Sequence, residues 1–336
     1  MSATPARPTP GRDRRGIGLI VYTVVAALVI GTAVWQSVAR GDQGTDVRSS
    51  MTLTAPAGAG GGWDTFMREQ QQAMRTNSLV GNVQVVNIPG AAGTIGLGRL
   101  STMDGQANVM MVSGAGLVAG VEQTGSPVTH DDVTMLGRVV EEYDVVVVPA
   151  DSPYETLEEL VEAWRADPGG IAWTGGGTFD QLVMTALAIE AGIEPSDLTY
   201  IPKSGGGEAV QALVTDTAQA ATSGYMDVSD QIEAGRLRAL GLAAPAPLDG
   251  VDIPTLTEQG YEVTLANFRV VAAPAGITGE EKTDLVELLT EATQTPEWQD
   301  AIQRNRWSDV FLTGPDFDAW FAEQQVQIAE LVELLG

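Results

Sequence analysis

The sequence predicts an α/β protein with two lobes, preceded by a membrane segment at the N-terminus. Three observations predict this fold class. Strand-like and helix-like runs alternate along most of the chain, which is typical of βαβ units around a mostly parallel sheet. Glycine-rich turns follow strand after strand, at the place where open α/β sheets bind their ligands. An uncharged run, residues 16–39, lies near the start of the chain.

The N-terminal run is expected to be a membrane anchor or a signal peptide. Its apolar centre, residues 17–35, is about long enough to span a bilayer, and three arginines precede it, as the positive-inside rule requires. Ser37-Val38-Ala39 resembles a signal-peptidase site, so cleavage is the alternative. We assign residues 1–40 as signal or anchor and 41–50 as a polar tether. The remainder is expected outside the cytoplasmic membrane, tethered to it by this helix or secreted after cleavage.

The charge balance argues against nucleic acid as a partner. The chain of 336 residues carries a formal net charge of −26. Residues 1–40 hold five arginines and one aspartate, a charge of +4, so the remainder carries −30. Nucleic-acid binding depends on neutralising phosphates with lysine and arginine. A small acidic ligand remains compatible with this charge, because local dipoles can outweigh a distant, screened net charge.

The residue inventory removes most catalytic and metal-binding templates. The sequence has no cysteine, and its single histidine is His130. Catalysis by a Ser-His-Asp arrangement would need that histidine, which we place at a surface turn and helix start. Zinc sites need several histidine or cysteine ligands, and no Walker or dinucleotide-binding glycine motif is complete. We therefore expect no catalytic residue, no metal and no cofactor.

The chain after the tether reads as a series of strands and helices. Asp64 is placed to cap an amphipathic helix, and Thr156 opens a helix over 156–165 with a Thr-x-x-Glu pattern. The other predicted helices cover 279–293, 297–305 and 315–335. The predicted strands are short apolar runs at 51–54, 83–87, 108–112, 144–149, 170–173, 198–201, 218–222, 237–242 and 268–274.

Glycine-rich turns follow six of these strands and predict a shared ligand cleft. They cover residues 56–62, 89–96, 113–116, 174–178, 203–207 and 223–225. Successive glycines let backbone N–H groups approach a ligand without Cβ interference. The N-terminus of each following helix adds unpaired donors and a positive dipole end. Such a site suits a small anion that is held mostly by backbone.

Several blocks of the sequence resemble one known family. Gly61-Gly62-Trp63-Asp64 with Arg68 looks like the family's opening G-G-x-D-x-x-x-R signature. Residues 89–96 resemble its P-G-A-G-G-x-x-G block, and residues 201–209 resemble its Y-x-G-G-G-E-A turn. From about Met51 to the C-terminus, the chain is similar to the substrate-binding proteins of tripartite tricarboxylate transporters, the TctC or Bug type.

The resemblance implies a type II periplasmic-binding-protein-like fold. Lobe one would cover about 50–147 plus 267–336, and lobe two about 148–266. The protein would capture a small di- or tricarboxylate between the lobes and deliver it to large and small membrane permease subunits. We expect a monomer that catalyses no reaction. The sequence departs from the family at Asp180-Gln181, where Asp-His is common, and at Phe268, where tryptophan or tyrosine is common.

The candidate ligand-binding residues come from the glycine turns. N–H groups of the first turn would grip one carboxylate, and the turns of lobe two would hold it from the other side. Asp64 is expected to cap its helix rather than touch an anion. The candidates are Gly60, Gly61, Gly62, Trp63, Gly90, Ala91, Gly93, Thr94, Ser113, Gly114, Thr174, Gly175, Gly176, Thr178, Ser204, Gly205, Gly206, Gly207, Glu208 and Tyr225.

Two other functions use the same turns. A sensing subunit would bind the same ligand and report to a receptor. An exported hydrolase would use the turns as an anion hole, but it would also need a nucleophile and a base, and the sequence offers no convincing pair.

Overall fold

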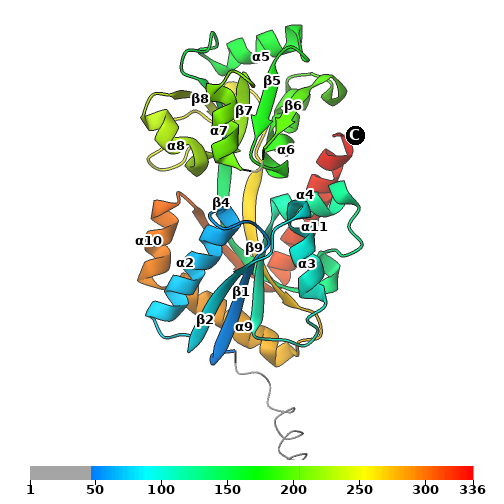
Figure 1. The fold of residues 1–336 in the computed structure, drawn as a ribbon, viewed down its shortest axis with the longest axis vertical. Helices are drawn as coiled ribbons and strands as arrows, with labels where there is room; N and C mark the ends of the chain where they lie inside the picture. The colour runs from blue at the N-terminus through cyan, green and yellow to red at the C-terminus, as the bar shows by residue number, and fades with distance from the viewer. Residues whose placement is uncertain (1–46, 204, 336) are drawn as a thin grey trace, which may run out of the picture. The chain divides into compact units, whose positions relative to one another are not determined.

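The structure, a computed structural model, describes residues 47–203 and 205–335 as an α/β protein (Figure 1). The predicted membrane segment, residues 1–40, and the candidate Ser204 lie outside the described residues, as does most of the predicted tether. Within the described residues, no helix is both long enough and apolar enough to cross a bilayer.

The strands form one mixed sheet. Its order is β2-β1-β3-β9-β4-β7-β5-β6, and β10 and β8 also pair with β4. Among the described residues, four pairings are parallel and five are antiparallel, so the prediction of a mostly parallel sheet was wrong. The strands are β1 Ser50–Ala55, β2 Asn82–Asn87, β3 Val109–Gly114, β4 Val133–Pro149, β5 Ala172–Gly175, β6 Thr199–Pro202, β7 Ala220–Gly224, β8 Leu237–Leu242, β9 Ala266–Pro274 and β10 Ser308–Thr313.

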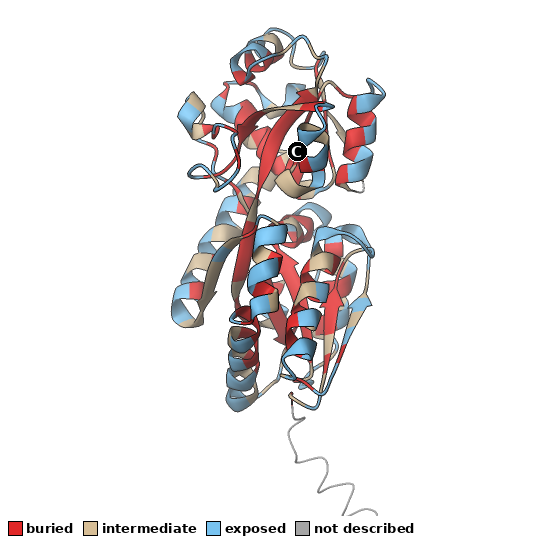
Figure 2. Cartoon of the chain, turned by 90° about the vertical axis from the view of Figure 1, so that its left-hand side faces the viewer, coloured by how far each residue is buried: buried red, intermediate tan, exposed pale blue. Residues whose placement is uncertain are grey.

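Helices follow most of the strands and cover the sheet, and their outer faces are exposed while most of the strand residues are buried (Figure 2). The last three helices agree with their predicted positions to within about two residues, and α9 has the predicted bounds. The helices are α2 Gly62–Thr76, α3 Thr94–Ser101, α4 Ala115–Thr124, α5 Leu157–Ala166, α6 Thr178–Glu190, α7 Gly206–Val214, α8 Tyr225–Glu233, α9 Gly279–Thr293, α10 Pro296–Arg304 and α11 Gly314–Glu333.

One long strand, β4, belongs to both parts of the sheet. Its first part pairs with β9 and β10, and its last part, from Asp144 onward, pairs with β7 and β8. The predicted strand at 144–149 is therefore only the end of a 17-residue strand. We call β1, β2, β3, β9, β10 and the first part of β4 the first sheet, and β5 to β8 with the last part of β4 the second sheet. Figure 1 shows β4 and β9 running between them.

Aromatic side chains pack in the hydrophobic core beside each of the two sheets. Beside the first sheet, the Trp298 ring meets Phe66 edge to face at 5.5 Å and Trp307 at 5.7 Å between centroids. Beside the second sheet, the buried rings of Trp164 and Trp173 lie 4.5 Å apart. Burying side chains of this size is a main source of stability, because apolar area removed from water contributes roughly 25 cal/mol per Å².

Local capping explains where several helices begin. Thr156 caps α5 as predicted, accepting a hydrogen bond from the Glu159 N–H at 3.2 Å. The prediction that Asp64 is the N-cap of α2 was wrong, because Gly61 occupies that position without a side-chain cap. Asp64 lies inside the first turn of α2 instead.

We predict that Gly114→Ala destabilises the protein. A Cβ at Gly114, the last residue of β3, would overlap the carbonyl oxygen of Phe268 on the neighbouring strand β9. Such overpacking costs about 1–3 kcal/mol. Gly98→Ala is the matched control, because a Cβ there meets no atom within 4 Å and alanine favours the helix. Thermal unfolding should show a lower Tm for Gly114→Ala only, and equal Tm values would contradict the packing role.

Candidate functional site

The first glycine turn follows β1 and leads into α2. The Gly60 N–H donates to Asp64 Oδ2 at 2.8 Å, and the Gly61 N–H donates to the Gly58 carbonyl at 3.3 Å. These two amides are therefore engaged within the turn, which corrects the expectation that they grip a ligand. Gly62 and Trp63 lie in the first turn of α2, where backbone N–H groups have no acceptor within the helix. The backbone N–H groups that this turn leaves without an acceptor in the helix thus include those of Gly62 and Trp63.

Asp64 holds this turn in shape. Its carboxylate accepts hydrogen bonds from Arg68 Nε at 2.8 Å and Asn87 Nδ2 at 2.9 Å, in addition to the one from Gly60. Desolvation acts to raise the pKa of Asp64, but these hydrogen bonds outweigh it and lower that pKa to about 2. The charged side chain of Asp64 therefore stabilises the backbone of the turn. This role is consistent with the expectation that Asp64 does not touch an anionic ligand.

The ring of Trp63 lies so close to two other glycines that it helps to explain why these positions lack a side chain. Its ring lies 2.9 Å from the position a Cβ would take on Gly93 and 3.6 Å from that position on Gly114. A Cβ on Gly90 would meet Ile95 at 2.6 Å, and the Thr94 hydroxyl donates to the Ala91 carbonyl at 2.8 Å. The turn over residues 89–96 is therefore shaped by packing against Trp63 and within itself.

The expectation that His130 lies at the surface was wrong. The residue is 3% exposed, and its Nε2 is 2.7 Å from Ser113 Oγ. Its ring packs edge to face on Phe321 at 5.4 Å, and burial lowers the pKa of His130 to about 4. Ser113 and Gly114 are buried as well, so we remove both from the ligand-binding set. A serine–histidine pair with no exposed surface on the serine offers no place for a substrate.

In the second sheet, two predicted turns are in contact. A Cβ on Gly176 would overlap the backbone of Gly205 and Gly206, so these turns meet because they lack side chains. The Lys203 N–H donates to the Gly175 carbonyl at 3.0 Å, which ties the same two turns together. Gly205 has no atom within 4 Å of its Cβ position and faces open space.

The remaining candidates of the second sheet differ in exposure. Thr174 is buried and its hydroxyl donates to the Ile201 carbonyl at 2.7 Å, which removes it from the ligand-binding set. The Thr178 hydroxyl donates to Gln123 Oε1 at 3.3 Å and so links α6 to α4. Gly175 and Gly206 are buried too. The other candidates with exposed or partly exposed surface are Gly176, Gly205, Gly207, Glu208 and Tyr225.

Arg269 connects the first turn to the centre of the molecule, and sequence reasoning did not single it out. Its Nη1 donates to the Gly62 carbonyl at 2.7 Å, and its Nη2 forms an ion pair with Glu142. Trp307 Nε1 donates to the same Glu142 at 3.3 Å, and the guanidinium lies 4.9 Å over the Trp307 ring. The sequence did contain a sign that Arg269 has a special role, because it is the charged residue within the otherwise apolar strand 268–274.

Three aspartates gather near the second-sheet turns, and they too were missed as a group. Burial, with the charges of Asp180, Glu142 and Asp227, raises the pKa of Asp144 well above its ordinary value. Burial raises the pKa of Asp180 to about 7. Asp227 keeps an exposed face, but the surrounding walls desolvate its carboxyl and raise its pKa to about 6. Only Asp180 lay within a predicted motif.

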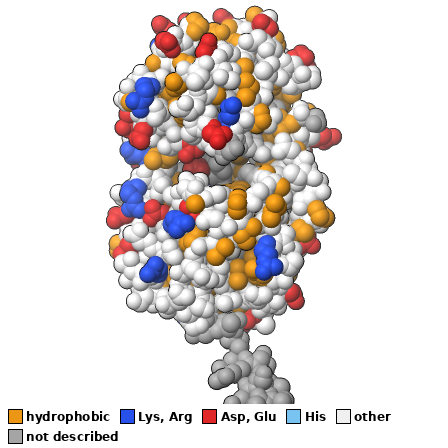
Figure 3. Space-filling view, in the orientation of Figure 1, with side chains coloured by type: hydrophobic (Ala, Val, Ile, Leu, Met, Phe, Trp, Pro, Cys, Tyr) orange, Lys and Arg blue, Asp and Glu red, His pale blue; other side chains and the backbone are white. Residues whose placement is uncertain are grey.

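The two turns are thus linked through named residues. Gly62 contacts Arg269, and Arg269 pairs with Glu142 on β4, two residues before the point where this strand joins the second sheet. There Asp144 is paired with Gly224, and Asp227 lies close to Gly206 and Gly224. Figure 3 shows the surface hollowed at mid-height, with acidic side chains at the rim.

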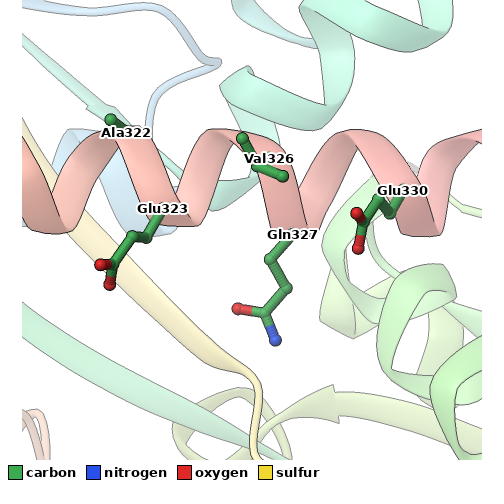
Figure 4. Close-up of a pocket in the computed structure, with 5 residues that line it drawn as sticks. All are labelled: Ala322, Glu323, Val326, Gln327 and Glu330. Carbon is green, nitrogen blue, oxygen red and sulfur yellow. The ribbon is translucent and has the colours of Figure 1, made fainter.

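A separate depression of about 400 Å³ lies along α11 (Figure 4). All of the residues that line it belong to that one helix: Ala322, Glu323, Val326, Gln327 and Glu330. It contains none of the glycine-turn residues. The depression is therefore not the site that the turns form.

The family model described as the tripartite tricarboxylate transporter family receptor, TctC, matches residues 66–336. The chain belongs to the TctC family. It is also similar to the UPF0065 protein in the gbd 5′ region of Cupriavidus necator, at 25% identity over 204 residues. That match covers 57% of this chain and 58% of the relative, so it spans less than two thirds of either.

Two solved structures share the fold. The MatC protein of Rhodopseudomonas palustris with bound malate superposes with a TM-score of 0.71 at 19% identity, covering 84% of this chain and 99% of that one. A second R. palustris protein, solved with adipate, gives a TM-score of 0.73 at 17% identity and covers 88% and 99%. The expected periplasmic-binding-protein-like fold is therefore confirmed for this TctC-family chain.

We predict that Asp180 makes stability depend on pH. Because its pKa is raised from 3.8 to about 7, the folded state keeps a proton that the unfolded chain releases. Its contribution is therefore full below about pH 4 and is lost as the pH rises through about 7. In Asp180→Asn, urea unfolding should show a smaller loss of stability between pH 5 and pH 8 than in the unsubstituted chain.

Asp230→Asn is the control for this measurement, because Asp230 is an exposed aspartate on α8. Burial lowers the pKa of His130, so this residue changes the stability with pH in the opposite direction to Asp180. All three chains contain His130, so its effect is the same in each of them. If Asp180→Asn loses as much stability over this pH range as the control, the assignment of a raised pKa is wrong.

Proposed function

We propose that this TctC-family protein is an extracytoplasmic solute-binding protein. It captures a small carboxylate between two lobes, 50–147 plus 267–336 and 148–266, for a tripartite tricarboxylate transporter. The observation that supports the proposal best is that Arg269 on β9 contacts Gly62 and pairs with Glu142 on β4, the strand that continues into the second sheet. In this proposal, glycine turns that are far apart in the sequence form one site.

In this proposal the ligand carboxylate binds at the start of α2. The N–H groups of Gly62 and Trp63 donate to it, and the positive end of the helix dipole adds to the attraction. The guanidinium of Arg269, held against the Gly62 carbonyl, supplies positive charge beside them. Gly205 and Thr178 approach from the second sheet. Two lobes joined by long strands such as β4 and β9 suit a hinge closure around the ligand.

The relatives support the carboxylate class. The R. palustris structures hold malate and adipate, which are both dicarboxylates. The shared family and fold make the same class of ligand the first to test here. The protein acts as a monomer that catalyses no reaction and hands its ligand to the large and small permease subunits.

We also propose that residues 16–39 remain as an N-terminal membrane anchor. The run is uncharged and arginines precede it. An uncleaved anchor would keep the binding lobes beside the permease. Cleavage after Ser37-Val38-Ala39 would release them, and mass spectrometry of the native N-terminus separates the two outcomes.

We predict that small organic acids raise the Tm of the full chain. A ligand present at a hundred times its Kd stabilises the folded state by roughly 2.7 kcal/mol. A thermal-shift panel of di- and tricarboxylates, amino acids, sugars and amines measures this. No shift with any acid, together with a shift by a sugar, would refute the carboxylate proposal.

The Gly61→Val variant tests where the acid binds. Gly61 has φ −77° and ψ 168°, which valine adopts readily, and the nearest atom to its Cβ position is 3.5 Å away. The fold should persist while the branched side chain blocks the start of α2, which weakens binding at least tenfold. Gly279→Val, at the exposed start of α9, is the matched control and should bind normally.

A further inference from the structure

The aspartates at the second-sheet turns point to the chemistry of the ligand's other end. Asp144 lies directly opposite Gly224 in the β4–β7 register, so both residues face the same side of the sheet. The Cβ position of Gly224 is 3.8 Å from Asp227 Oδ2, and that of Gly206 is 2.8 Å from the same oxygen. Asp144 and Asp227 therefore flank the glycines that end β7 and begin α7.

Asp180 joins them from α6. Its Oδ2 accepts the Gly176 N–H at 2.5 Å and lies 3.1 Å from the Cβ position of Gly175. Burial raises the pKa of the Tyr200 hydroxyl, and the charges of Asp180 and Asp144 add to this effect. The second-sheet end of the proposed site is thus lined by carboxyl groups.

Asp144 lacks a partner. It is 0% exposed, and within the described residues neither of its carboxyl oxygens has a hydrogen-bond partner. A buried polar group in this state costs free energy unless a donor reaches it or a proton neutralises it. Because it is buried and no positive charge among the described residues offsets this, the carboxyl of Asp144 has a raised pKa and holds a proton, and a cation bound at the turns would be favoured in place of that proton.

The chemistry of this end favours an organic cation over a metal ion or a second carboxylate. The described residues contain no group of three or more acidic or histidine side chains arranged to hold a metal ion. The guanidinium of Arg269 lies at the first turn and is already paired with Glu142. A second ligand carboxylate would meet the negative charge of Asp227, because a pKa of about 6 leaves that side chain charged at neutral pH. A protonated amine instead offers three N–H donors and a positive charge.

We propose that the ligand is a carboxylate that carries a protonated amine, and that Asp227 binds the amine with the buried Asp180 and Asp144 behind it. This inference rests on the proposed function, because the carboxylate still binds at Gly62 and Trp63. Asp227, with its exposed face, is the residue that contacts the amine first.

Matched ligand pairs test the inference. Calorimetric titration of the full chain compares succinate with β-alanine, glutarate with 4-aminobutyrate, and adipate with 5-aminopentanoate. Each pair has the same spacing and exchanges one carboxylate for an ammonium. In at least one pair the amino acid should bind about tenfold or more tightly than its diacid, since a charge-assisted hydrogen bond contributes about that factor.

Asp227→Asn removes the charge and keeps the shape of the side chain. It should weaken binding of the amino acid about tenfold and leave diacid binding unchanged or stronger. Asp230→Asn, three residues along the same helix, is the matched control and should bind as the unsubstituted chain does. Far-ultraviolet circular dichroism confirms that each variant is folded.

The outcomes separate this inference from the function on which it rests. Diacids that bind as tightly as or more tightly than their amino-acid partners overturn the inference and leave carboxylate capture standing. The comparison uses the unsubstituted chain, so it holds even if Asp227→Asn fails to fold. If no member of either series binds, the inference and the carboxylate proposal fail together.

Discussion

The pairing of β4 with β9, and the ion pair that these strands carry, is the constraint on which the structure depends. β9 joins β4 to β3 and the rest of the first sheet, and β4 continues into the second sheet. Glu142 and Arg269 lie on these two strands, and Arg269 reaches the Gly62 carbonyl. Removing one partner of a buried ion pair costs about 3–5 kcal/mol. Loss of this pair would therefore disturb both the core and the first glycine turn.

The glycines divide into two kinds with different physical roles. Gly93, Gly114 and Gly176 lack a side chain because neighbouring atoms already occupy the Cβ position. Gly205 has open space there instead, and at Gly61 the nearest atom lies at an ordinary contact distance of 3.5 Å. A sequence shows both kinds as the same letter. The open glycines are those where a ligand can approach the backbone, and they lie at the starts of α2 and α7.

Local patterns in the sequence predicted the turns and many of the helices and strands. The start of α9 depends on a capping box formed by residues close together in the sequence, beginning at Thr278. This bound of the helix could therefore be predicted from the sequence. The burial of His130 could not, because it depends on Ser113 and Phe321 from other elements. The same holds for Arg269, whose partners Gly62 and Glu142 are distant in sequence, and for Asp144, whose surroundings include the distant Asp180 and Asp227. The six turns were placed correctly, but their separation into packing and open positions required the fold.

Amide hydrogen exchange on the full chain, with and without a bound organic acid, tests the central claim most directly. If one ligand binds between the two glycine turns, it should slow exchange together at Gly62 and Trp63 and at residues 205–207. The helix α11, with its separate depression, should exchange as before. Protection confined to one turn, or centred on residues 322–330, would contradict a shared site built from both turns.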